Sequence, residues 1–280
     1  LHCCLKHWWM RGLKEEKKII PDDKESAIEK FKKKLRWDEN EKWFDHGGIG
    51  LLFYAACSNE ECVVADLLAE LKRDFEGEEY SRRLESRVRR QGYVALGVPG
   101  EASTLVVAMI LASSEVVSML LESGAIVESV DVMGQDGFML ASAFGRPKNL
   151  QYWLERVKDW DLNRQNTVLG GCALGNAVYV GANKLETVKV LLDAGASLDY
   201  RTYGGGSVLT SLTASEDSDP DVLRFVLEKL RLSEEYSSTV NDKRKSTTMK
   251  WKGIYFVAKA LYRTGVSKTG LMAHLALESG

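Results

Sequence analysis

Apolar residues recur at helical spacing in two similar strings, residues 115–125 and 186–196, whose starts lie 71 positions apart. Both fit the pattern E-x-V-x-x-L-L-x-x-G-A. The valine and leucine positions form one apolar stripe of a helix, and the glycine predicts a stop at a residue with positive φ. A helix this short is not stable alone. The two copies therefore predict a chain of repeated helices that bury their stripes against one another.

Weaker copies of the stripe occur at residues 62–68, 149–154, 221–227 and 272–280. Before the third of these, Asp219 and Pro220 suit the N-cap and the first position of a helix. The last leucines of all six copies are Leu68, Leu121, Leu154, Leu192, Leu227 and Leu277, with gaps of 53, 33, 38, 35 and 50 residues. The middle gaps are close to a repeat of about 33 residues, and the outer gaps indicate insertions of about 20 and 17 residues.

An apolar or small-residue segment precedes each stripe, so the pattern predicts pairs of helices. The first helices of these pairs are expected at 51–56, 104–108, 137–143, 167–173, 207–210 and 251–258. Alanines and other small residues in these first helices let the two helices of a pair approach closely.

The residues after the two glycine stops, 125–128 and 196–199, and the sequence Asp161-Leu162-Asn163 are similar to the end of the ankyrin repeat, L-L-x-x-G-A-D-V-N. Over about residues 46–280 the chain therefore resembles the ankyrin-repeat family. The resemblance implies an all-α fold, an ankyrin-like helical-repeat solenoid of about five or six repeats with hairpin loops. The proline and histidine of the family's T-P-L-H-x-A opening are missing, and only Thr104, Thr167 and Ser207 retain its hydroxyl.

The chain before the repeats carries one predicted helix. Residues 21–37 place Ala27, Ile28, Phe31 and Leu35 on one face, with lysines on the others. We expect residues 1–45 to form an N-terminal helical extension that caps the first repeat.

Residues 46–280 are expected to form the repeat stack, with insertions near 73–103 and 231–250. The second insertion contains a basic tract followed by hydroxyl residues, 243–248, which is either a kinase target or a plain solvated loop. Because the chain stops at Gly280 within a repeat motif, we expect it to be truncated, with a longer parent protein in which the stack continues.

Charge and composition restrict the function classes. Lysine and arginine total 38 against 40 aspartates and glutamates, for a net charge of −2. A dedicated nucleic-acid binder usually has a basic surplus, so the balance disfavours that class. The chain has no apolar run of the length that a membrane span needs. Its five scattered cysteines indicate reduced thiols and an intracellular, cytoplasmic location.

No catalytic or cofactor motif is complete. Cys3, Cys4 and His7 lie close together, but no second cluster completes a metal site. Residues 265–270 lack the glycine that directly precedes lysine in a phosphate loop. The chain has neither a G-x-S-x-G elbow nor an H-E-x-x-H motif. The sequence therefore predicts a protein that is not an enzyme and needs no cofactor.

The resemblance implies that partners bind at hairpin tips and at the exposed side of first helices, which together form a concave surface. By position in the repeat, the expected partner-binding residues are Met133, Gln135, Arg164, Gln165, Tyr200, Arg201 and Tyr203. Tyrosine and arginine are enriched at binding hot spots. For the two tyrosines, packing of the hairpin is an equally good interpretation, whereas we expect the two arginines to be exposed.

We therefore expect a monomeric, non-catalytic scaffold for protein–protein interaction, whose partner is another protein. The alternative is a targeting or regulatory arm of a larger enzyme or signalling protein whose catalytic part lies outside this chain. Nucleic-acid binding is a third hypothesis, and the charge balance disfavours it.

Overall fold

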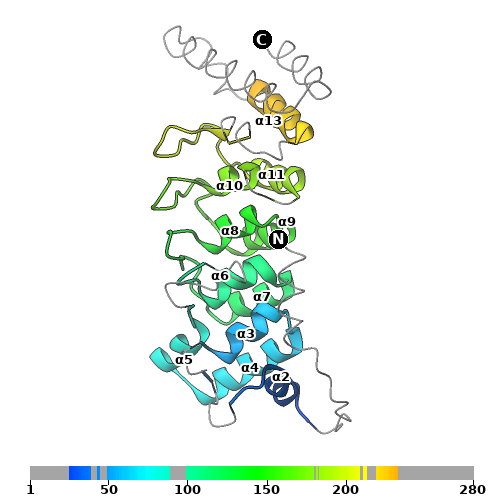
Figure 1. The fold of residues 1–280 in the computed structure, drawn as a ribbon, viewed down its shortest axis with the longest axis vertical. Helices are drawn as coiled ribbons and strands as arrows, with labels where there is room; N and C mark the ends of the chain where they lie inside the picture. The colour runs from blue at the N-terminus through cyan, green and yellow to red at the C-terminus, as the bar shows by residue number, and fades with distance from the viewer. Residues whose placement is uncertain are drawn as a thin grey trace. The chain divides into compact units, whose positions relative to one another are not determined.

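The structure, a computed structural model, describes residues 25–38, 43–44, 49–88, 99–179, 181, 183–208, 211–212 and 219–232. Within these residues there are eleven helices and no strand, so the described part of the chain is all-α (Figure 1). Three isolated antiparallel bridges occur in its loops. The chain divides into two compact units, Leu1–Leu140 with Glu155–Val157, and Ala141–Leu154 with Lys158–Gly280.

The first unit contains two helix pairs. One additional helix precedes the first pair in the sequence and another follows it. The helices of this unit are α2 (Ala27–Leu35), α3 (Leu51–Ser58), α4 (Glu61–Asp74), α5 (Gly77–Leu84), α6 (Thr104–Leu111) and α7 (Ser114–Glu122), and the pairs are α3 with α4 and α6 with α7. Helix α3 packs against α4 within its pair and against α6 of the next pair, and α4 packs against α7 (Figure 1). Helices α2 and α5 both contact α4.

The second unit contains α10 (Ala173–Tyr179), α11 (Lys184–Asp193) and α13 (Pro220–Leu232). Helix α10 packs against α11, and α11 packs against α13. The remaining helices, α8 (Gly137–Ala143) and α9 (Pro147–Arg156), have residues in both units. As expected, α13 begins at Pro220, and the Asp219 carboxylate accepts a hydrogen bond from the Asp221 amide at 2.9 Å.

The two similar strings form α7 and α11 and end in the same way. Gly124 and Gly195 have φ values of +85° and +96°, as the glycine stop predicts. The next amide closes each helix end, since Ala125 donates to Leu120 O at 3.1 Å and Ala196 donates to Leu191 O at 3.0 Å. Leu120 and Leu191 are fully buried, whereas the second leucine of each pair is half-buried. The first leucine is therefore the core residue of each copy.

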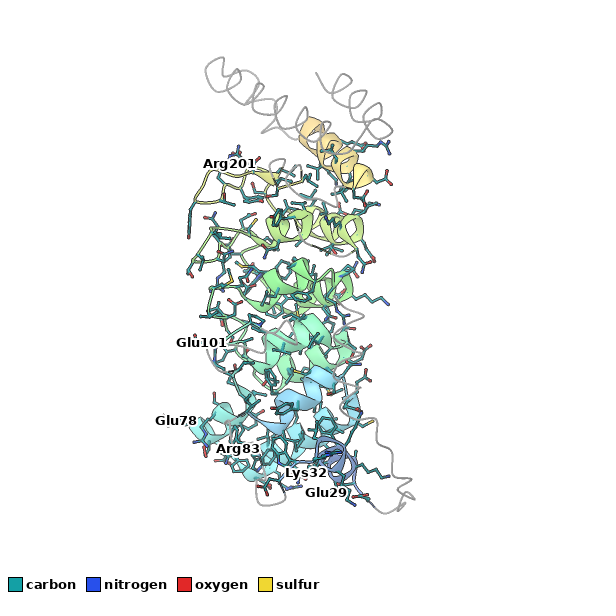
Figure 2. All side chains as sticks on the ribbon, in the orientation of Figure 1. Glu29, Lys32, Glu78, Arg83, Glu101 and Arg201 are labelled. Carbon is teal, nitrogen blue, oxygen red and sulfur yellow. The ribbon has the colours of Figure 1, made fainter. Side chains whose placement is uncertain are left out.

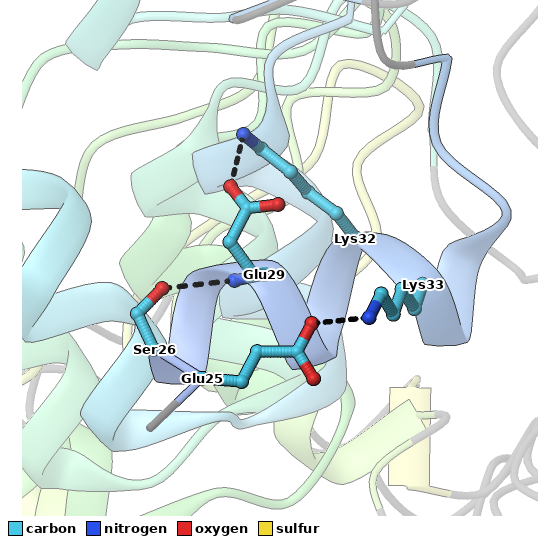
Figure 3. Close-up of polar contacts among 5 residues, drawn as sticks. All are labelled: Glu25, Ser26, Glu29, Lys32 and Lys33. Atoms are coloured by element: carbon cyan, nitrogen blue, oxygen red, sulfur yellow. Dashed lines mark hydrogen bonds and ion pairs between the residues drawn. The ribbon is translucent and has the colours of Figure 1, made fainter. Parts of the chain in front are cut away.

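Helix α2 lies within the predicted span 21–37, and its buried face includes Ile28 and Phe31. The Ser26 hydroxyl accepts a hydrogen bond from the Glu29 amide at 3.2 Å, which caps the first turn (Figure 3). Surface ion pairs join Lys32 to Glu29 at 2.8 Å and Lys33 to Glu25 at 2.6 Å (Figure 3). Exposed pairs of this kind contribute little to stability.

The expected first helices at 51–56, 104–108 and 137–143 are confirmed as α3, α6 and α8. The prediction of a helix at 167–173 is wrong, because α10 begins only at Ala173. Residues 166–171 form a turn instead. The Asn166 side-chain oxygen accepts from the amides of Val168 at 3.2 Å and Leu169 at 2.8 Å, and this competes with helical hydrogen bonding.

Some predictions fall on residues outside the described ranges. These are the helices at 251–258 and 272–280, the basic tract at 243–248, residues 265–270, and the cluster of Cys3, Cys4 and His7. The first insertion, near 73–103, is partly described and contains α5, which the charge pattern does not predict.

Candidate functional site

A tight turn precedes α8 in the first unit, at the hairpin tip that the sequence predicts. The Asp131 amide donates to Gln135 O at 2.9 Å, and the Gly134 amide donates to Asp131 O at 3.0 Å. The Asp131 carboxylate accepts from the amides of Met133 and Gln135, both at 2.8 Å. Burial raises the pKa of this carboxyl, and the two amide bonds oppose the shift. Met133 and Gln135 are half-buried.

Two turns of the second unit are closed in the same way, by a backbone hydrogen bond and by the side chain of the first residue. In the turn 166–171, the Asn166 amide donates to Gly171 O at 2.9 Å. In the turn 202–206, the Thr202 amide donates to Gly206 O at 2.9 Å, and the Thr202 hydroxyl accepts from the Gly206 amide at 2.8 Å. A polar side chain at the start thus organises each turn, as Asp131 does in the first unit.

A backbone hydrogen bond joins consecutive loops within each unit. Val132 N donates to Gly100 O at 2.8 Å in the first unit, and Tyr203 N donates to Leu169 O at 3.0 Å in the second. Val132 lies five residues before the first residue of α8, and Tyr203 lies five residues before the helical residue Val208. The acceptors Gly100 and Leu169 lie four residues before α6 and α10. Within each unit, the hydrogen bond therefore joins equivalent positions of two consecutive loops.

Large apolar side chains are exposed at these turns. Among the described residues, six large hydrophobic side chains are exposed: Ile126, Val132, Val168, Leu169, Tyr179 and Tyr203. Four of the six lie in the turns, and three of those four are in the second unit, with exposed fractions of 52% for Val168, 61% for Leu169 and 65% for Tyr203. We call Val168, Leu169, Tyr203 and the adjacent exposed Gly204 the tip surface. Clustered exposed apolar side chains are typical of interaction sites.

The loop backbones hold the tip surface in place. The Gln165 side-chain amide donates to Gly170 O at 2.7 Å and to Arg201 O at 2.6 Å, so it connects the two loops. Farther from the tip, the Ser197 amide donates to the Asn163 side chain at 2.8 Å. Gln165, which the sequence suggests as a partner contact, is exposed and also has this structural role.

The two predicted arginines lie on the same loops and already have partners. Arg201 forms an ion pair with Asp199 at 2.8 Å and donates to Tyr200 O at 2.9 Å. Figure 2 shows Arg201 on the loop that follows α11, and its side chain is 37% exposed. The Arg164 guanidinium lies 5.8 Å from the centre of the Trp160 ring. Both arginines are half-buried, and each already interacts with a neighbouring side chain.

Tyr200 is the correction among the predicted site residues. Its side chain is only 7% exposed, which favours the packing interpretation over a partner contact for this residue. The hydroxyl shares a hydrogen bond of 3.0 Å with Ser211 Oγ, and the ring lies against Gly175 of α10. Burial raises the pKa of Tyr200 to about 12, and the Ser211 bond opposes this shift.

Sequence reasoning missed Val168 and Leu169, because it assigned them to a first helix at 167–173. The available signal is Asn166 before them and Gly170-Gly171 after them, a combination typical of turns. Val132 directly precedes the expected contact Met133 and was not itself selected as a contact. It is exposed on the corresponding turn of the first unit.

The described residues offer no group of three or more histidine, cysteine or acidic side chains that could hold a metal ion. Burial raises the pKa of the Cys57 and Cys172 thiols, so both remain protonated at neutral pH. No helix among the residues described here is both long enough and apolar enough to cross a membrane.

Comparison of the sequence with protein-family models gives no match, and comparison with curated proteins gives none either.

Proposed function

We propose that this protein is an ankyrin-type repeat scaffold that binds another protein through the tip surface. The observation that carries the proposal is the position of the exposed apolar side chains. Val168, Leu169 and Tyr203 lie on turns whose backbones are hydrogen-bonded to each other.

Three features support the ankyrin-type interpretation. Helices follow one another in pairs, from α3 and α4 to α10 and α11. The second helices α7 and α11 end at glycines with positive φ and with equivalent closing hydrogen bonds. The bond from one loop to the next has the same register in both units. A repeat built this way contacts mainly its neighbours and presents its loops on a rigid base.

The binding role is supported by preorganisation. Asn166 and Thr202 fix the two turns, and the bond from Tyr203 to Leu169 fixes one turn against the other. A surface that is ordered before binding loses less conformational entropy when a partner arrives. The function requires no catalytic group and no cofactor, only apolar contact area in a fixed arrangement.

The test uses the full chain and random peptides displayed on phage. Selected peptides should bind the native chain and should lose most of their binding to the double variant Leu169→Ser/Tyr203→Ser. Tyr179→Ser is the matched control, because Tyr179 is also exposed but lies at the end of α10. If the double variant binds the peptides as well as the native chain does and unfolds at the same temperature, the tip surface is not the binding site.

A further inference from the structure

The tip surface lies within two stretches of sequence that have no charged residue. Residues 165–183 and residues 202–215 contain no lysine, arginine, aspartate or glutamate, in a chain of which 28% is charged. The bond from Tyr203 N to Leu169 O places one stretch beside the other. The exposed apolar side chains of the second unit therefore belong to two paired segments of the chain that carry no charge.

The charged residues that directly precede the two stretches, Arg164 and Arg201, already have partners. Arg201 is neutralised by Asp199 at 2.8 Å, and Arg164 faces the ring of Trp160. A charged segment that bound over Val168, Leu169 and Tyr203 would lose hydration and gain no opposite charge there. A neutral, apolar segment loses no ionic hydration and gains buried apolar area.

Gly204 adds an independent observation. Its φ is not in the left-handed range, and a Cβ placed on it would meet no atom of the described residues within 4 Å. Its neighbours are different, since Gly205 has φ +78° and a Cβ on Gly206 would lie 2.9 Å from Thr202 Oγ1. Positive φ thus favours glycine at 205 and the close Thr202 side chain favours it at 206, but the described residues give no reason for glycine at 204. A bare backbone beside the exposed Tyr203 lets another backbone approach closely.

We propose that the tip surface takes an uncharged peptide segment with apolar side chains, and that the backbone of this segment lies close to Gly204. The inference rests on the proposed binding function and adds the chemistry of the partner. It follows from the match between an uncharged apolar surface and an uncharged apolar occupant.

The first experiment determines the charge of the occupant. Random peptides displayed on phage are selected on the full chain, and one selected sequence is synthesised with blocked termini. The selected sequences should be rich in aromatic and aliphatic residues and have no net charge. Affinity should change by less than about twofold between about 0.05 M and about 0.5 M NaCl, because no ion pair forms at the surface. Acidic or basic selected sequences, or a loss of more than about tenfold with salt, would overturn the inference.

The second experiment tests the close approach at Gly204. Gly204→Val should weaken binding of the synthetic peptide by about tenfold or more and leave the unfolding temperature unchanged, since the site is open to solvent. Gly204→Ala should give a smaller loss, and it replaces the valine variant if that variant does not fold. Full affinity in a folded Gly204 variant contradicts the close approach.

The outcomes separate the two proposals. If the selected peptides bind Leu169→Ser/Tyr203→Ser as well as the native chain, the proposed function fails. If binding needs Leu169 and Tyr203 but the peptides are charged, only the partner chemistry fails. If sedimentation shows that the native chain self-associates and the double variant does not, the occupant is a second copy of this chain, which also overturns the peptide proposal.

Discussion

Tyr200 fills the space left by the missing side chain of Gly175. A Cβ on Gly175 would lie 2.7 Å from Tyr200 Cζ and would also collide with the Tyr200 hydroxyl. The tyrosine comes from the loop after α11, and the glycine lies within α10. This contact holds the loop that carries Tyr203 against α10, so it stabilises the position of the tip surface.

Gly175→Ala should therefore destabilise the protein, although alanine is the better helix former. Overpacking of this kind costs about 1–3 kcal/mol, measurable by urea or thermal unfolding. Gly204→Ala is the matched control and should change stability little, because its Cβ would meet no atom of the described part of the chain within 4 Å. Combining Gly175→Ala with Tyr200→Phe should cost less than the sum of the two single variants, because phenylalanine removes the colliding hydroxyl. Additive costs would show that the two residues do not touch.

Tyr200 should also make stability depend on pH in the alkaline range. Its pKa rises from about 10 in the unfolded chain to about 12 in the fold, so the folded state holds its proton longer. The resulting stabilisation is complete below pH 10 and is lost as the pH rises toward 12. It amounts to on the order of 2 kcal/mol. The difference in unfolding free energy between the native chain and Tyr200→Phe should shrink across this window, and a constant difference would contradict the burial of the phenol.

Thr187 of α11 and Val116 of α7 occupy equivalent positions in the two similar strings. Both are fully buried, and the Thr187 hydroxyl has no hydrogen-bond partner among the described residues. Thr187→Val should stabilise the protein by about 1 kcal/mol, because it removes an unsatisfied polar group and keeps the shape. Val116→Thr should destabilise it by a similar or larger amount. If chemical unfolding finds that Thr187→Val is destabilising, the hydroxyl has a partner and the equivalence is incomplete.

Asp131 should be required for the turn before α8. Asp131→Ala removes the acceptor for the amides of Met133 and Gln135 and should cost about 1–2 kcal/mol. Asp131→Asn keeps one acceptor oxygen without the buried charge, so it should retain most of the stability. Unfolding of the two variants side by side separates the hydrogen bonds from the charge. Equal losses would assign the effect to the charge.

The second helices could be predicted from the sequence because their information is local. An apolar stripe and a glycine stop specify α7 and α11, and they also located the buried leucines to within one position. The start of α10 could not be predicted from periodicity. Residues 167–173 contain apolar and small residues, but the Asn166 side chain and the positive φ of Gly170 form a turn there.

Other features depend on contacts between distant residues. Helix α5 has a mixed-charge sequence with one buried residue, Leu84, and it is held by tertiary contacts. The Tyr80 hydroxyl donates to Ser123 O at 2.8 Å, and the Arg83 guanidinium lies 3.8 Å from the centre of the Phe75 ring. The side chains labelled on α5 in Figure 2 include Arg83. The burial of Tyr200 has the same origin, because it depends on a glycine 25 positions earlier in the chain.

Amide hydrogen exchange of the full chain, with and without the selected synthetic peptide, tests binding at the tip surface most directly. Bound peptide should slow exchange at the amides of residues 166–171 and 202–206, the turns that carry Val168, Leu169 and Tyr203. The amides on α9 and α13 should exchange as in the free chain. Protection that leaves both turns unchanged and appears elsewhere would contradict the assignment of this surface as the binding site.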